Sequence, residues 1–123
     1  ARRCSPVDSS SADATASLHN PACGDRVTVE LALEEGRIAA LAHVTHGCVL
    51  AQASAALLAG SAQGRDAASL GELAGSVRAF LKGGPLPEGY GVFDGVIGHA
   101  GRHVCVMLPL EAALKALESA QKS

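Results

Sequence analysis

The chain has 123 residues, a formal net charge of −2 at pH 7, and 48% hydrophobic residues, of which few are aromatic. This length corresponds to one domain with a single modest core, and its interspersed charges leave no basic stripe for nucleic acid. No apolar run is long enough to span a membrane, and four widely spaced cysteines favour reduced thiols in the cytoplasm over a disulfide scaffold.

The first twelve residues are polar and rich in serine, and they include Cys4, which has no ligand-like neighbour. We expect residues 1 to 12 to form a flexible N-terminal segment and residues 13 to 123 to form a single domain. The sequence begins without a methionine, which suggests that it starts inside a longer product or after processing.

Three strands are predicted next. Asp13 to His19 is a short candidate strand, and residues 26 to 34 alternate between apolar and polar side chains, the period of a strand with one buried face. Glu35-Gly36 is typical of a tight hairpin turn. The return strand, from Arg37 to Thr45, would place four residues on one face: Ile38, Ala40, Ala42 and Val44. The pattern predicts an antiparallel sheet with one solvated side.

The period changes to that of a helix at Gly47-Cys48, and this helix would end near Gly60. Its predicted apolar stripe is Val49, Leu50, Ala53, Leu57 and Leu58. A capping box at Ser69-Leu70-Gly71-Glu72 predicts a second helix, which would stop at Gly83.

Residues 83 to 101 are rich in glycine and are expected to form a loop with one short helical turn. Pro109 lacks an amide hydrogen and is tolerated in the first turn of a helix. We therefore predict a last helix from about Leu108 to Ala120, with Cys105 just ahead of it.

Three cysteines then fall at junctions between elements: Cys23, Cys48 and Cys105. Asp25 is two residues after Cys23, so both side chains would leave the same face if the strand begins nearby. Cys48 would lie at a helix N-terminus, which favours the thiolate. Three thiolates and one carboxylate suit a four-coordinate zinc or iron site. The alternative is that these cysteines are scattered residues of the core.

Three motifs occur in order along the chain: Asn20-Pro21-Ala22-Cys23-Gly24-Asp25-Arg26, then Gly47-Cys48 followed by Gln52-Ala53-Ser54-Ala55, then Arg102-His103-Val104-Cys105. This ordered set resembles the U-type iron–sulfur cluster assembly family, which includes IscU, the NifU N-terminal domain and SufU. The resemblance implies an α+β fold of the SufE/NifU-like scaffold type, an antiparallel three-stranded sheet with helices packed on one face.

The SufU branch is the more similar one. IscU-type members carry a histidine directly before the third cysteine, and Val104 stands at that position here. An arginine three residues before that cysteine, here Arg102, and a long segment between Cys48 and Cys105 are SufU features. Two departures are expected from the family pattern: the usual N-terminal helix is absent or reduced to residues 1 to 12, and apolar residues directly follow Cys48.

By this resemblance, Zn²⁺ is held by four residues: Cys23, Asp25, Cys48 and Cys105. Cys23 would leave the metal to accept persulfide sulfur from a cysteine desulfurase of the SufS or IscS kind, and Arg102 would assist. Asp25, a weaker ligand than a thiolate, would keep the site labile. The implied function is a zinc-dependent sulfur acceptor, a sulfurtransferase that serves iron–sulfur cluster biogenesis.

Two other interpretations use the same residues. In the first, a non-enzymatic scaffold assembles a transient [2Fe–2S] cluster, or binds iron, on Cys23, Cys48 and Cys105 and transfers it to apo iron–sulfur proteins or downstream carriers. In the second, the zinc is purely structural. Among the histidines, His46 is the best spare ligand, whereas the other candidates are expected to be ordinary polar residues: His19, His43 on the solvent-leaning face of its strand, and His99.

Overall fold

A computed structural model describes residues 14–20, 24–87, 89–98 and 100–121. Three strands come first in the chain, β1 (Ala14–Asn20), β2 (Asp25–Glu34) and β3 (Arg37–His46). The helices follow in the order α1 (Val49–Ser61), α2 (Ala67–Leu81), the 3-10 helix η2 (Tyr90–Val96) and α3 (Ala100–Gln121). The predicted N-terminal segment, residues 1 to 12, lies outside the described residues.

The strands form one antiparallel sheet in the order β1-β2-β3. Glu35 and Gly36 connect β2 to β3 with φ angles of 54° and 80°. Two consecutive left-handed residues make the hairpin turn that matches the twist of the flanking strands. The predicted turn and the predicted three-stranded sheet are therefore confirmed.

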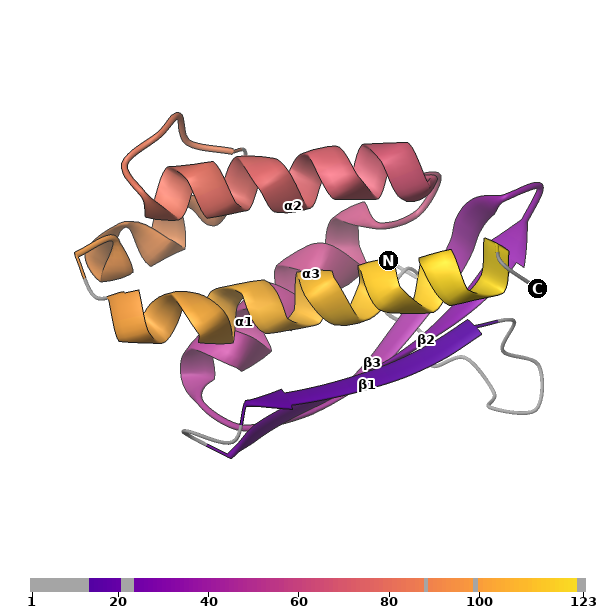
Figure 1. Cartoon of the computed structure of the whole chain (residues 1–123), viewed down its shortest axis with the longest axis horizontal. Helices are drawn as coiled ribbons and strands as arrows, with labels where there is room; N and C mark the ends of the chain where they lie inside the picture. Colours follow the sequence, from indigo (N-terminus) through magenta and orange to yellow (C-terminus); the bar gives the residue numbers. More distant parts are fainter. Residues whose placement is uncertain (1–13, 21–23, 88, 99, 122–123) are drawn as a thin grey trace.

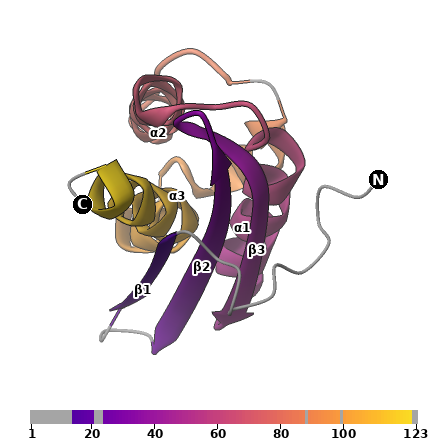
Figure 2. The ribbon, with the colours of Figure 1, turned by 90° about the vertical axis from the view of Figure 1, so that its right-hand side faces the viewer.

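All three α-helices lie on one side of this sheet (Figures 1 and 2). Helix α3 packs on β1 and β2, α1 packs on β3, and α2 packs on α3. The predicted α+β class, with helices on one face, is confirmed. No helix in the described ranges has the length and apolar character needed to cross a membrane.

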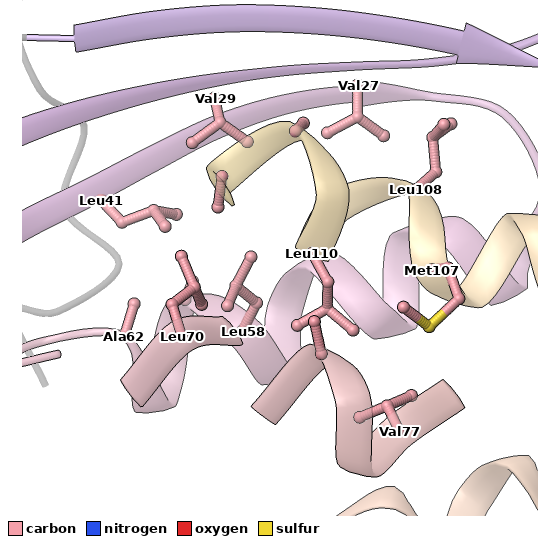
Figure 3. Packing of buried hydrophobic residues seen from close by; sticks show 14 of the residues in the cluster. Val27, Val29, Leu41, Leu58, Ala62, Leu70, Val77, Met107, Leu108 and Leu110 are labelled. Carbon is pink, nitrogen blue, oxygen red and sulfur yellow. The ribbon is translucent and has the colours of Figure 1, made fainter. Parts of the chain in front are cut away.

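The core lies between the sheet and the helices. Val27, Val29 and Leu31 of β2 are completely buried, as the alternation predicted. In Figure 3, Val27 and Val29 point from β2 towards α3, and Leu110 of α3 lies between that helix and α2. The core is mostly aliphatic, and only Tyr90, Phe93 and Phe80 add buried rings. Burial of this apolar surface stabilises the fold by about 25 cal/mol per Å².

The predicted inward face of β3 is confirmed at Ile38, which is buried, but it is wrong from Ala40 onwards. Leu41, not Ala40 or Ala42, pairs with Leu31 and is buried, whereas Val44 is 57% exposed. An irregularity in the pairing of β2 with β3, between Ala32 and Leu33, shifts the alternation by one residue. A bulge of this kind reverses which side chains face the core.

The predicted stripe of α1 is confirmed except at Val49: Leu58 is buried in the core, and Leu50, Ala53 and Leu57 are partly buried and pack against it. The buried residues of this helix are Ala51, Ser54, Ala55, Leu58 and Ala59, whereas Val49 is 77% exposed. Small residues also face the core, where α1 packs against α3.

Helix α2 begins earlier than the predicted capping box. Its N-cap is Asp66, whose carboxylate accepts a hydrogen bond from the Ser69 amide at 2.9 Å. Ser69 and Glu72 therefore lie inside the first turns. An aspartate N-cap satisfies the same free amides that a serine would.

Helix α3 begins at Ala100, eight residues before the predicted start, and contains Pro109 in its interior. A proline inside a helix removes one backbone hydrogen bond. Burial of Val106, Met107 and Leu108 compensates for this loss. Cys105 is thus not at a junction but inside a long helix, where it is 1% exposed.

Candidate metal centre

Three of the predicted ligands come together from three different elements. Asp25 begins β2, Cys48 directly precedes α1, and Cys105 lies on the second turn of α3. One carboxylate oxygen and the two Sγ atoms all lie within 4.8 Å of one another. Residues 23, 80 and 57 positions apart cannot meet by local structure, so the packing of α1 and α3 on the sheet creates this cluster.

The Asp25 carboxylate is the centre of the cluster. Its Oδ1 accepts a hydrogen bond from the Cys48 amide at 3.0 Å, and its Oδ2 accepts one from the Cys48 thiol at 3.3 Å. The residue is 1% exposed, and a buried carboxylate requires such partners. The positive end of the α1 macrodipole also stabilises the negative charge of the Asp25 carboxylate. The first turn of α1 has no acidic residue of its own.

Gly47 makes room for this carboxylate. A Cβ atom at Gly47 would lie 2.7 Å from Cγ of Asp25 and 2.9 Å from its Cβ, closer than real Cβ atoms approach. The carbonyl of Gly47 accepts a hydrogen bond from the Gln52 side chain at 3.1 Å. The glycine that precedes Cys48 therefore leaves the space that the Asp25 carboxylate occupies.

Ser54 connects the helices that hold the two thiols. This residue of α1 is completely buried, and its hydroxyl donates to the backbone carbonyl of Val106 in α3 at 2.6 Å. Because Val106 directly follows Cys105, the bond fixes that turn of α3 relative to the helix that begins after Cys48. Sequence reasoning noted Ser54 only as part of a motif, and the apolar stripe expected for α1 gave no signal of its role.

The donor set fits a thiophilic ion. Two Zn–S bonds of about 2.3 Å at a tetrahedral angle place their sulfurs about 3.8 Å apart. Atoms that lie within 4.8 Å of one another thus need to close by about 1 Å at most. Two thiols and one carboxylate leave one tetrahedral position for a fourth ligand.

The remaining predicted site residues are placed as follows. Cys23, like Cys4 and His99, lies outside the described residues. Arg102 is exposed on α3, one turn before Cys105, and makes no ion pair with any described residue. His46 is exposed at the end of β3 and is not part of the cluster.

The expected position of His43 on the solvent-leaning face of its strand is wrong. It pairs with Val29 across the sheet and so lies on the helix-covered face, not on the solvent-leaning one. Its ring nitrogen Nδ1 is 3.0 Å from the hydroxyl of Thr45. Burial lowers the pKa of His43 below its ordinary value of 6.5.

Comparison with known proteins gives a matching family model and similar solved structures. The family model described as NifU-like N terminal domain matches residues 3–88. The crystal structure of a nitrogen-fixing NifU-like protein (N-terminal) from Brucella abortus has a TM-score of 0.88 and 28% identity, over 98% of this chain and 86% of that one.

A protein of Fervidobacterium islandicum AW-1, described as an iron–sulfur cluster assembly scaffold for the SUF system, has a TM-score of 0.79 and 21% identity, over 94% of this chain and 87% of that one. At this identity it shows the shared fold alone. A comparison with curated proteins gave no match. The family model covers well over half of the sequence, and the chain therefore belongs to the NifU-like N-terminal domain family, within the U-type iron–sulfur cluster assembly proteins.

Proposed function

We propose that this protein is a zinc-binding sulfur acceptor of the SufU type, which takes persulfide sulfur from a cysteine desulfurase for iron–sulfur cluster biogenesis in the cytoplasm. The observation that carries the proposal is the convergence of Asp25, Cys48 and Cys105 within 4.8 Å in a member of the U-type family. The step of 57 positions from Cys48 to Cys105, and Val104 in place of a histidine, favour the SufU type.

Cys23 is the proposed fourth ligand. Chain geometry allows at most about 7 Å between the α-carbons of residues two apart, which is compatible with Cys23 and Asp25 binding one ion. Bound zinc would keep the thiols of the site ionised at neutral pH. Asp25, a harder donor than a thiolate, would hold the fourth position weakly.

The thiols differ in how accessible they are to a partner. Cys105 is 1% exposed inside α3, so a partner's persulfide cannot reach it without opening the helix layer. Cys48 is half-buried and hydrogen-bonded to Asp25 through both its amide and its thiol. Both are suited to holding the site, which leaves Cys23 as the thiol that accepts sulfur.

The proposed reaction is a thiol–persulfide exchange. The Cys23 thiolate attacks the outer sulfur of the desulfurase persulfide, a new S–S bond forms, and the old S–S bond breaks. The desulfurase cysteine leaves as a thiolate, and Cys23 then carries the sulfur as a persulfide. No net oxidation or reduction occurs. Arg102, an exposed cation one turn before Cys105, would stabilise the anions near the site.

A second candidate is a scaffold on which a [2Fe–2S] cluster is assembled and passed to apo iron–sulfur proteins. The similarity to a NifU-like protein at 28% identity favours it, and its ligands are the same cysteines. The two candidates differ in the resident metal and in the effect on the desulfurase.

The proposal can be tested by measuring the metal content of protein purified anaerobically and its effect on a desulfurase. We expect about one zinc per chain and a several-fold increase in turnover of a SufS-type desulfurase, measured as alanine released. The Cys23→Ser variant should lose this stimulation and stay folded, and Cys4→Ser is the matched control. Cluster absorbance without zinc, together with unchanged turnover, would favour the scaffold. Unfolding of Cys23→Ser would favour a structural zinc.

A further inference from the structure

A cavity of about 480 Å³ lies on the helical side of the molecule. Residues of α1, α2 and η2 line it, with Ala56, Leu57 and Leu73 supplying an apolar wall and Arg65 and Tyr90 supplying polar groups. A second hollow of about 300 Å³ shares Arg65 and Leu73 with it. The volume is in the range of small-molecule sites, which combine apolar walls with a few fixed polar groups.

Tyr90 lines this cavity and carries an unsatisfied hydroxyl. Tyr90 is 2% exposed, and its hydroxyl has no hydrogen-bond partner among the described residues. Its ring is fixed against Phe93, with the ring centroids 5.8 Å apart. Tyrosine hydroxyls normally find a partner when they are buried. The free hydroxyl therefore points to a ligand atom that accepts a hydrogen bond.

Arg65 supplies a fixed positive charge at the same cavity. Its Nε donates to the carbonyl of Ser61 at 2.9 Å, and its Nη1 donates to the hydroxyl of Ser69 at 2.9 Å. These bonds hold the guanidinium in place but leave Nη2 without a partner among the described residues. Arg65 also forms no ion pair there, in contrast to Arg78, which pairs with Glu111 at 3.2 Å.

The two polar groups act on each other. Burial raises the pKa of Tyr90 to about 12, and the nearby Arg65 charge acts in the opposite direction. The hydroxyl thus stays protonated at neutral pH and remains a donor. A ligand at this position meets donors from both residues and a positive charge from one of them.

We propose that this cavity binds a small organic carboxylate, whose oxygens accept hydrogen bonds from the Tyr90 hydroxyl and from Nη2 of Arg65. The aliphatic part of the ligand packs against Leu57 and Leu73. A carboxylate is the ligand class that accepts bonds from both donors and balances the charge. The site is distinct from the metal centre, because Ala56, its lining residue nearest to Cys48 in the sequence, lies eight residues after Cys48, about 12 Å at 1.5 Å per residue.

Hexanoate is a suitable probe of this site, with 1-hexanol and hexylammonium as neutral and cationic controls of similar length. We expect hexanoate to cause saturable shifts in the backbone amide signals of Leu57, Gly60 and Leu73 in a ¹H–¹⁵N titration of the full chain. The two control compounds should cause none that saturate over the same concentration range.

Two variants test the donors. Tyr90→Phe keeps the ring and removes only an unsatisfied hydroxyl, so its Tm should be unchanged or higher, whereas hexanoate should bind about tenfold more weakly. Arg65→Gln should weaken binding at least as much. The matched control is Arg78→Gln, which also removes one positive charge but from a position in α2 outside the cavity. This variant should bind hexanoate as tightly as the wild type does. Because Tyr90→Phe is nearly isosteric, it decides the question even if Arg65→Gln does not fold.

The proposal is overturned if hexanoate gives no saturable shift, or if hexanol binds as well as hexanoate does. It is also overturned if Tyr90→Phe binds hexanoate as tightly as the wild type. These results do not depend on the metal centre, because zinc content and desulfurase stimulation are measured separately and should be unchanged in Tyr90→Phe.

Discussion

Asp25 and Gly47 share a space that holds only one side chain: a Cβ at Gly47 would lie 2.7 Å from the carboxylate carbon of Asp25. The strand that begins at Asp25 and the turn before α1 are thereby locked together at the metal centre. The glycine permits the carboxylate to reach the Cys48 amide and thiol.

We expect Gly47→Ala to displace the Asp25 carboxylate and to lower zinc affinity by about tenfold to a hundredfold, the usual effect of disturbing the support of a metal ligand. Competition with a zinc-binding dye measures this affinity. The matched control is Gly75→Ala in α2, where nothing lies within 4 Å of the added methyl group. The control should retain zinc and gain about 0.5–1 kcal/mol of stability, since alanine is favoured over glycine inside a helix. Equal zinc affinity in the two variants would contradict the steric argument.

Asp25→Asn keeps an oxygen that can accept the hydrogen bond from the Cys48 amide but replaces an anionic ligand with a neutral one. We therefore expect the metal-free variant to stay folded and to bind zinc at least about tenfold more weakly than the wild type does. Circular dichroism and the same dye competition measure the two effects. Asp94→Asn, an exposed change in η2, is the control and should bind zinc normally. Undiminished zinc affinity in Asp25→Asn would exclude the carboxylate as a ligand.

Ser54→Ala removes the buried hydrogen bond to the Val106 carbonyl. Loss of such a bond costs about 1 kcal/mol, and more where the carbonyl is left without its partner. The free energy of unfolding in urea should fall by about 1–2 kcal/mol, whereas the exposed Ser76→Ala should change it by less than about 0.5 kcal/mol. Similar values for both variants would show that the contact between α1 and α3 does not depend on this bond.

His43 makes stability depend on pH. Burial lowers its pKa in the folded protein, so the unfolded chain binds more protons between the folded value and the ordinary value of 6.5. The neutral form therefore stabilises the fold above pH 6.5, and this contribution is lost as the pH falls from 6.5 through the lower pKa of the folded protein. In metal-free protein, we expect His43→Gln to lose less unfolding free energy than the wild type between pH 7.5 and pH 5.5. An equal loss in both proteins would assign the pH dependence to other groups.

Sequence patterns predicted most of the sheet but less of the helix layer. Alternation at Val27, Val29 and Leu31 predicted the inward face of β2, because those residues obey a local period of two. The bulge opposite Ala32 could not be predicted, since it arises from the pairing with β3. It reversed the face of Val44. The early start of α3 at Ala100 was hidden by glycines, whose low helix propensity is outweighed by packing on the sheet.

The metal centre shows the same division. The motifs identified Asp25, Cys48 and Cys105 as candidates, but Cys105 was expected ahead of a helix and lies inside one. The roles of Gly47 and Ser54 depend on contacts between segments 22 and 52 residues apart. No local pattern encodes such contacts, so they were found only when the elements were packed together.

The most direct test of this account is a crystal structure of the zinc-loaded protein with anomalous data collected at the zinc absorption edge. We predict a single anomalous peak, bonded to the sulfurs of Cys23, Cys48 and Cys105 and to one carboxylate oxygen of Asp25. A zinc ion bound elsewhere, or one that lacks Asp25, Cys48 or Cys105 among its ligands, would contradict the account.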